Sequence, residues 1–196
     1  MRQGYRILGT AVLIGGLILV SIPLAKWGIS SYNQYRSINN WEENQQPVLE
    51  QEEEPPEEKP TILPEDEGLL VIEKINLKTV VIHGISEEDL KLGPGFYPQS
   101  THPEIGNVSI AAHRGVYGSW FRNVDKLEAG DEILLYIGDM IYRYAVREQF
   151  ITHSRDWSIT ESDGNPELTL TTCLFTTTTK RLIVKADLVE AQKNLE

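Results

Sequence analysis

The feature that most constrains this chain is an uncharged stretch of 19 residues near its N-terminus, from Ile7 to Ala25. As a helix rising about 1.5 Å per residue, it would reach roughly 28 Å, close to the ~30 Å hydrocarbon core of a bilayer. Lys26 and Trp27 follow it, and such residues are common where a span meets the membrane surface. We therefore predict a transmembrane helix over residues 7–29.

The charges around this stretch indicate its orientation. Arg2 and Arg6 precede it, and positive charge beside a membrane span favours the cytoplasmic side. Residues 1–6 would then be cytoplasmic, and the rest of the chain would lie outside the cell, tethered to the cell membrane by a single pass. A cleaved signal peptide is the alternative, but its apolar region is usually only about 7–15 residues long and no convincing cleavage site follows.

Residues 30–67 are predicted to be an acidic, extracellular linker. Residues 42–67 alone hold eleven acidic residues and one basic residue, a local charge of −10 within a formal net charge of −11. Like charges and prolines keep such a segment extended, and its few apolar side chains cannot offset the entropy lost on folding. The favoured interpretation is a stalk, and the alternative is a docking tail. The acidity also argues against nucleic acid as a partner, because phosphates require clustered Lys and Arg.

Residues 68–196 have the size of a single domain and are predicted to be mostly β-structure. Gly138 and Asp139 fit a two-residue hairpin turn, and only residues 119–130 suggest a helical turn or two. Several short strands between turns are typical of a β-barrel or a sandwich. The strands are expected within five segments rich in Val, Ile, Leu and Thr, namely residues 69–85, 107–113, 131–153, 167–175 and 181–189.

Cys173 is the only cysteine, which excludes an internal disulfide and a cysteine zinc site. A lone thiol outside the cell is either buried and inert or deliberately reactive. Cys173 ends one expected strand, His113 ends another, and Arg181 opens a third. An imidazole can take the thiol proton and return it to a leaving amine, and a guanidinium can stabilise an oxyanion. The three residues together indicate nucleophilic cysteine chemistry, provided that the fold brings them together.

The sequence around these residues resembles the sortases of Gram-positive bacteria. The segments NVSIAAHRG, FRNVDKLEAGDEI, LTLTTC and KRLIV occur in the order of that family's blocks, which include TLxTC, a His after a small residue, and a later Arg that opens the last strand. The likeness covers roughly residues 70–190. It implies a mostly β fold, a closed eight-stranded sortase-type barrel with short helices, preceded here by one transmembrane helix.

The resemblance also implies an activity. Sortases are cysteine transpeptidases, of the cysteine-peptidase class of hydrolases, that cut an LPxTG-like sorting signal after its Thr. They hold the protein as a thioacyl intermediate and pass it to an amine of a cell-wall precursor or a pilin Lys. Carried over by motif, Cys173 is the nucleophile, His113 the general acid and base, and Arg181 the stabiliser of the oxyanion. Thr172 is implied to support the same intermediate.

No cofactor or metal is implied, and calcium modulation cannot be assigned because the acidic loops lack a diagnostic ligand spacing. Among sortases, the sequence is similar to class D, which anchors proteins to the wall. A pilin polymerase is less favoured, because residues 37–70 contain no Asp-Pro-aromatic lid tripeptide and the polar C-terminal EAQKNLE is no second span. The alternatives are a hydrolytic cysteine peptidase and a membrane-tethered binding module with an inert Cys173. The remaining histidines are expected to be structural or at the surface, namely His83, His102 and His153.

Overall fold

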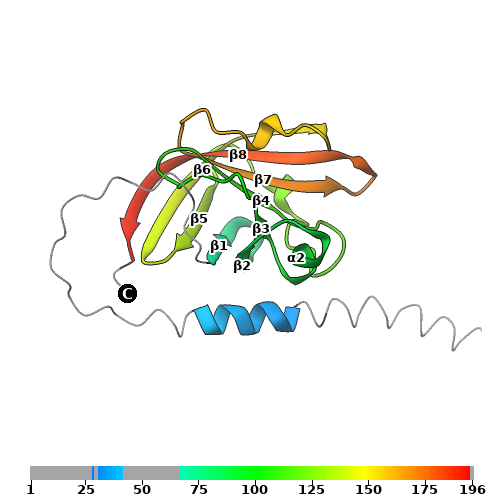
Figure 1. Cartoon of the computed structure of the whole chain (residues 1–196), viewed down its shortest axis with the longest axis horizontal. Helices are drawn as coiled ribbons and strands as arrows, with labels where there is room; N and C mark the ends of the chain where they lie inside the picture. The colour runs from blue at the N-terminus through cyan, green and yellow to red at the C-terminus, as the bar shows by residue number, and fades with distance from the viewer. Residues whose placement is uncertain (1–27, 29–30, 42–66, 195–196) are drawn as a thin grey trace, which may run out of the picture.

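A computed structural model describes residue 28, residues 31–41 and residues 67–194 of the chain (Figure 1). Most of these residues form a closed barrel with the strand order β1-β2-β3-β4-β7-β8-β6-β5. This confirms the mostly β, eight-stranded barrel implied by the sequence. The strands are β1 (Gly68–Ile72), β2 (Leu77–His83), β3 (Gly95–Phe96), β4 (Asn107–Ala111), β5 (Glu132–Ile137), β6 (Met140–His153), β7 (Glu167–Leu174) and β8 (Thr177–Lys193).

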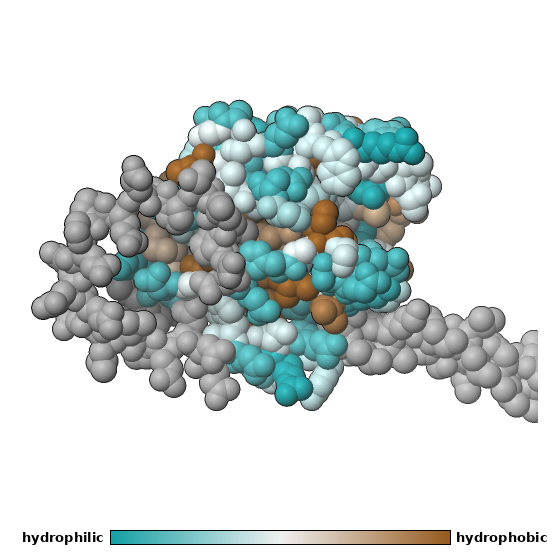
Figure 2. Space-filling model, in the orientation of Figure 1, coloured by the Kyte–Doolittle hydropathy of each residue, from teal (hydrophilic) through white to brown (hydrophobic). Residues whose placement is uncertain are grey.

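The helical elements of the barrel domain are short. They are η1 (Glu73–Ile75), α2 (Glu87–Leu92), η2 (Val124–Lys126) and η3 (Ser158–Thr160). Residues 31–41, which fall in the range expected to be linker, are also helical. This N-terminal helix runs below β1, β2 and α2 in Figure 1. In the same view, hydrophilic residues cover much of the barrel, and hydrophobic residues gather near the centre of the face, above the helix (Figure 2).

The predicted transmembrane helix, residues 7–29, lies almost entirely outside the described residues. Within the part of the chain that the structure describes, no helix is long and apolar enough to cross a bilayer. The membrane span, its orientation and the extracellular location therefore stay predictions.

The barrel core follows from the alternation of the strands. In β5, the residues Ile133, Leu135 and Ile137 are buried, and the residues between them are more exposed. This period of two is that of a strand with one face on the core. By contrast, β4 is buried along its whole length. The loop that contains η3 supplies this cover, since it is hydrogen-bonded to the side chain of Asn107 in β4.

The turn predicted at Gly138 and Asp139 is present, because Ile137 and Met140 are paired across it. Gly138 has a φ of 56°, a value that glycine adopts without steric cost. The helix suggested over residues 119–130 is reduced to the three-residue η2. The connection between β7 and β8 is shorter than the gap between the expected strand segments 167–175 and 181–189, because β8 already begins at Thr177. Its threonines are β-branched and suit a strand.

Candidate active site

Three neighbouring strands place His113, Cys173 and Arg181 in one row. Strands β4 and β7 run parallel, with Ala111 opposite Thr171. Continuing this register by two residues puts His113 opposite Cys173. On the other side of β7, Cys173 and Arg181 are direct partners in the antiparallel pair with β8. Because neighbouring strands lie about 4.8 Å apart, His113 and Arg181 lie next to Cys173 on its two sides.

The same three side chains line one cavity of about 250 Å³. One part of its lining comes from Ile85 and Leu90, in and just before α2. Another part comes from the segment around η3, in the connection between β6 and β7. The sequence-predicted triad therefore meets in a pocket built from elements that are far apart in the chain. The segment around η3 contributes Trp157, Ile159 and Thr160 to the lining.

His113 is half-buried, and no described group hydrogen-bonds its buried Nε2. Burial lowers the pKa of His113 below its ordinary value, because surroundings poor in water disfavour the imidazolium. Glu87 raises this pKa and Lys91 lowers it, both by smaller amounts. The ring of Tyr117 packs against the imidazole with centroids 5.3 Å apart. This lowered pKa favours the uncharged imidazole, in which one nitrogen can accept a proton.

Cys173 is a free thiol of intermediate exposure. The pairing of β7 with β8 shifts register directly after it, between Cys173 and Leu174. An inert structural cysteine is typically fully buried. The position of Cys173, partly exposed at the wall of a cavity, differs from that of an inert thiol.

Thr172 is buried, and its hydroxyl donates to the carbonyl oxygen of Ala112 at 2.7 Å. The amide of Ala112 in turn donates to the carbonyl oxygen of Thr171 at 3.2 Å. These two bonds clamp β7 to the residue that precedes His113. The hydroxyl of Thr172 is thus engaged with the backbone, and its role in the geometry is to hold the histidine beside the thiol.

Arg181 lies four residues after the first residue of β8, and not at the start of the strand as expected, and backbone carbonyls hold its side chain. Its Nη1 donates to the carbonyl oxygens of Thr178 at 2.8 Å and Lys180 at 3.3 Å. A guanidinium carries five N–H donors, so further donors remain to bind an oxygen in the cavity. This arrangement fixes the direction of the group in the wall of the cavity that Cys173 also lines.

The Arg181→Ala variant is expected to lower kcat/KM for a peptide substrate about 10²–10³-fold, the usual cost of losing one donor to an oxyanion. Arg181→Lys keeps the positive charge but lacks the planar set of N–H donors of a guanidinium. Its kcat/KM should therefore lie between those of Arg181→Ala and the unaltered chain. Steady-state kinetics with both variants measure the effect. Near-normal turnover by Arg181→Ala would remove Arg181 from the oxyanion role.

The geometry agrees with the comparison to known protein families. The family model of the sortase domain matches residues 70–189, more than half of the chain. The chain belongs to the sortase family. Sortases are cysteine transpeptidases that need no cofactor. In the described residues, no group of three or more His, Cys, Asp or Glu side chains is placed to hold a metal ion.

Individual sortases support a class D-like assignment. Sortase D of Bacillus subtilis (strain 168) is 34% identical over 108 residues, which cover 54% of this chain and 53% of that protein. Sortase A of Bacillus anthracis is 30% identical over 124 residues, 62% of this chain and 59% of that protein. The matches thus span somewhat over half the length of these curated relatives. The structure of a Clostridium perfringens sortase D5 transpeptidase has a TM-score of 0.60 and 34% identity, and covers 64% of this chain and 79% of its own.

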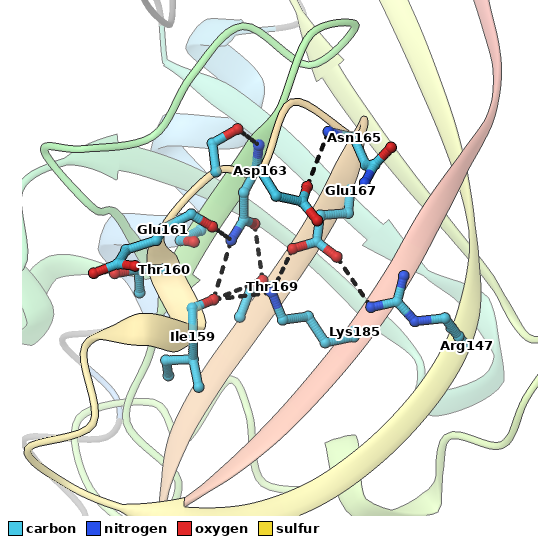
Figure 3. A network of polar contacts seen from close by, with 12 residues as sticks. Arg147, Ile159, Thr160, Glu161, Asp163, Asn165, Glu167, Thr169 and Lys185 are labelled. Carbon is cyan, nitrogen blue, oxygen red and sulfur yellow. Dashed lines mark hydrogen bonds and ion pairs between the residues drawn. The ribbon is translucent and has the colours of Figure 1, made fainter.

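A buried polar network holds η3 of this sortase against the barrel (Figure 3). Lys185 is 8% exposed, donates to the carbonyl oxygen of Ile159 at 2.9 Å and forms an ion pair with Glu167. Asn107 donates to the same carbonyl at 3.0 Å, and the hydroxyl of Thr169 donates to Asn107 Oδ1 at 2.8 Å. The backbone of a residue that lines the cavity is therefore fixed from β4 and β8.

The Lys185→Met variant is expected to lower the free energy of unfolding by about 3 kcal/mol, because it leaves the Glu167 carboxylate buried without its main partner. Arg147 still contacts Glu167 at 3.0 Å, which keeps the loss at the lower end of the usual range. Urea denaturation followed by circular dichroism measures it. Adding Glu167→Gln to the variant should recover part of the stability, and exposed Lys180→Met is the matched control. A loss under about 1 kcal/mol would contradict this account of the network.

Two aromatic residues of the cavity were missed by the sequence analysis. The hydroxyl of Tyr97 shares a hydrogen bond of 2.9 Å with the hydroxyl of Thr171, and burial raises the pKa of Tyr97 so that it stays protonated. Trp157 is 57% exposed, and its ring meets that of Tyr97 edge-on at 6.5 Å. A large exposed aromatic beside a catalytic cavity offers a surface for a peptide. Only the fold places both residues near the thiol.

Arg114, next to His113, was also missed. It is buried, and its guanidinium lies 4.4 Å from the centre of the Phe175 ring. Its Nη2 forms an ion pair of 2.9 Å with Asp125. Arg114 thus joins the loop after the histidine to the loop after Cys173. The other histidines lie outside the cavity lining: His83 packs on Phe96, His102 on Tyr142, and His153 accepts a hydrogen bond from the Arg155 amide.

Proposed function

We propose that this sortase is a membrane-anchored transpeptidase that cuts an LPxTG-like sorting signal after its Thr. It then transfers the protein to an amine of a cell-wall precursor. The observation that carries the proposal is the row of His113, Cys173 and Arg181 across three strands of a sortase-family barrel, all facing one cavity.

The first half-reaction follows from this row. His113 takes the proton of the Cys173 thiol as the sulfur attacks the carbonyl carbon of the scissile peptide bond. Arg181 binds the oxygen of the resulting tetrahedral intermediate, where negative charge develops. The carbon–nitrogen bond then breaks, and His113 returns the proton to the leaving amine. The product is a thioester between Cys173 and the Thr of the signal.

In the second half-reaction, an amine attacks the thioester carbonyl and gives its proton to His113. Arg181 again binds the oxyanion, and the thiolate leaves as the new amide bond forms. The similarity of this chain to class D sortases supports a cell-wall precursor as the acceptor of the protein. A pilin Lys would make the chain a pilin polymerase, and water would make it a hydrolytic peptidase, with the same three side chains.

The location of the reaction is part of the proposal. An apolar helix over residues 7–29, with Arg2 and Arg6 on its cytoplasmic side, would place the barrel outside the cell. Sorting-signal proteins and wall precursors would meet the barrel there.

The acceptor is tested by incubating the full-length chain in detergent with an LPxTG-type peptide, with and without hydroxylamine. A transpeptidase should give the peptide hydroxamate when hydroxylamine is present and little free acid when it is absent. Rapid release of free acid, unaffected by hydroxylamine, would favour hydrolysis and overturn the transfer proposal.

A further inference from the structure

The N-terminal helix, residues 31–41, contacts the barrel through a buried side chain, Gln34, which is 6% exposed, and through the ring of Trp41, which meets that of Tyr136 edge-on at 6.0 Å. The Oε1 of Gln34 accepts hydrogen bonds from the Val80 amide and the Thr79 hydroxyl, each at 3.0 Å. Its Nε2 donates to the carbonyl oxygens of Val80 at 3.4 Å and Leu92 at 3.2 Å. An amide side chain has two donors and two acceptor sites, so the whole capacity of Gln34 is used.

The short strand β3 explains why Gln34 fits there. β2 pairs with β3 only through Ile82 and His83. The amide of Ile82 donates toward β3, to the carbonyl oxygen of Pro94. Val80, two residues earlier, presents its N–H and C=O on the same side of β2, where β3 has not yet begun. Buried backbone groups need partners, and Gln34 supplies one donor and one acceptor as a neighbouring strand would.

The contact with Leu92 connects this attachment to the active-site cavity. Leu92 is the last residue of α2, which has a capping box at its start but no buried residue of its own. Because none of its side chains is buried, the hydrogen bond from Gln34 to the Leu92 carbonyl is one of the contacts that hold the helix on the barrel. Leu90 of α2 lines the cavity. Lys91 of α2 lies 5.9 Å from the centre of the Tyr117 ring, which packs on His113.

We infer that Gln34 is a positioning residue that joins the N-terminal helix to the barrel and fixes the α2 side of the active-site cavity. The folded catalytic unit then includes residues 31–41, and the acidic residues 42–66 connect two parts of one unit. A change in the N-terminal helix would thereby reach the peptide-binding cavity. The role of Gln34 in holding the helix and α2 is independent of the proposed function. Only the expected effect on peptide turnover rests on that function.

Gly93 provides a second way to disturb the same contact. A Cβ at this position would lie 2.4 Å from Gln34 Nε2 and 3.3 Å from the Val80 carbonyl oxygen. The φ of Gly93 is −173°, an extended conformation that alanine also adopts. Gly93→Ala should therefore displace the amide of Gln34 without straining the backbone.

The test compares Gln34→Leu and Gly93→Ala with Tyr32→Ala, a change at a residue of the same helix that is 64% exposed. The first readout is hydrogen–deuterium exchange of the full-length chain in detergent, followed at the amide of Val80 and at the amide of Leu90 in α2, which donates to the carbonyl oxygen of Ser86. Exchange at both amides should become at least about tenfold faster in Gln34→Leu and Gly93→Ala, here called the latch variants, and stay unchanged in Tyr32→Ala. Unchanged exchange at Val80 in both latch variants would overturn the inference. Faster exchange at Val80 alone would remove the link to α2.

The second readout is kinetic and separates positioning from general damage. The latch variants should raise KM for the sorting peptide several-fold, while alkylation of Cys173 by iodoacetamide keeps the rate of the unaltered chain. If peptide turnover and the alkylation of Cys173 slow by the same factor, Gln34 has a merely structural role, and the inference is contradicted. If the unaltered chain turns over no peptide, the proposed function fails, and the exchange results still decide the role of Gln34.

Discussion

Cys173→Ala is expected to abolish peptide cleavage and transfer, down to the rate measured without enzyme. The chain contains no other thiol that could form the thioester. The neighbouring hydroxyl of Thr172 cannot replace it, because that hydroxyl donates to the carbonyl of Ala112. Liquid chromatography of the cleaved and the amine-capped peptide measures the loss.

The fold should survive this change, because Cys173 is only half-buried and sits at the cavity wall. An unchanged circular dichroism spectrum and urea midpoint would show that the lost activity reflects lost chemistry. Cys173→Ser is the matched variant, since it keeps the shape but offers a far weaker nucleophile at neutral pH. Transfer above the uncatalysed rate by Cys173→Ala would mean that another group carries the acyl chain.

The His113→Ala variant is expected to lower kcat/KM about 10²–10⁴-fold, the usual contribution of a positioned acid and base. Both half-reactions need a group that takes a proton from a nucleophile and gives it back, and His113 is the imidazole opposite the thiol. Exposed His83→Gln is the control and should keep full activity, because His83 does not line the cavity. Comparable losses in the two variants would contradict the assignment.

The pH behaviour of His113 provides a second check on the same residue. Burial lowers its pKa, so the imidazole of the free enzyme stays uncharged to a lower pH than an exposed histidine, whose pKa is about 6.5. In the Cys173→Ala variant, where no thiol titrates with it, NMR should show a midpoint below that value. Lys91→Met should raise the midpoint, because the ammonium of Lys91 disfavours the imidazolium. A midpoint above 6.5 in the Cys173→Ala variant would contradict the burial argument.

Local patterns in the sequence were sufficient to predict much of the barrel. The alternation over residues 131–153 predicted the β5–β6 hairpin, and Gly138 with Asp139 marked its turn. The catalytic candidates were found by motif, but their proximity was not predictable from spacing. It depends on a parallel pairing of β4 with β7, whose partners are 60 positions apart along the chain.

Two further features could not be predicted because their residues resemble surface residues. Lys185 is a charged residue between the apolar Val184 and Ala186, as a solvent-facing lysine would be, yet it is buried against the carbonyl of Ile159. Gln34 lies in a polar segment before an acidic one, and nothing local distinguishes it from a linker residue. Its position follows from a stretch of β2 that has no strand partner on the side of β3, which only the assembled barrel reveals.

The most direct test of the central claim is intact-protein mass spectrometry of the full-length chain after incubation with an LPxTG-type peptide. The account predicts an adduct with the mass of the peptide cut after Thr, mapped to Cys173 by proteolysis. A small amine added afterwards should discharge this adduct and yield the amine-capped peptide. An adduct on any other residue, or no adduct on a Cys173 that iodoacetamide alkylates readily, would contradict the claim.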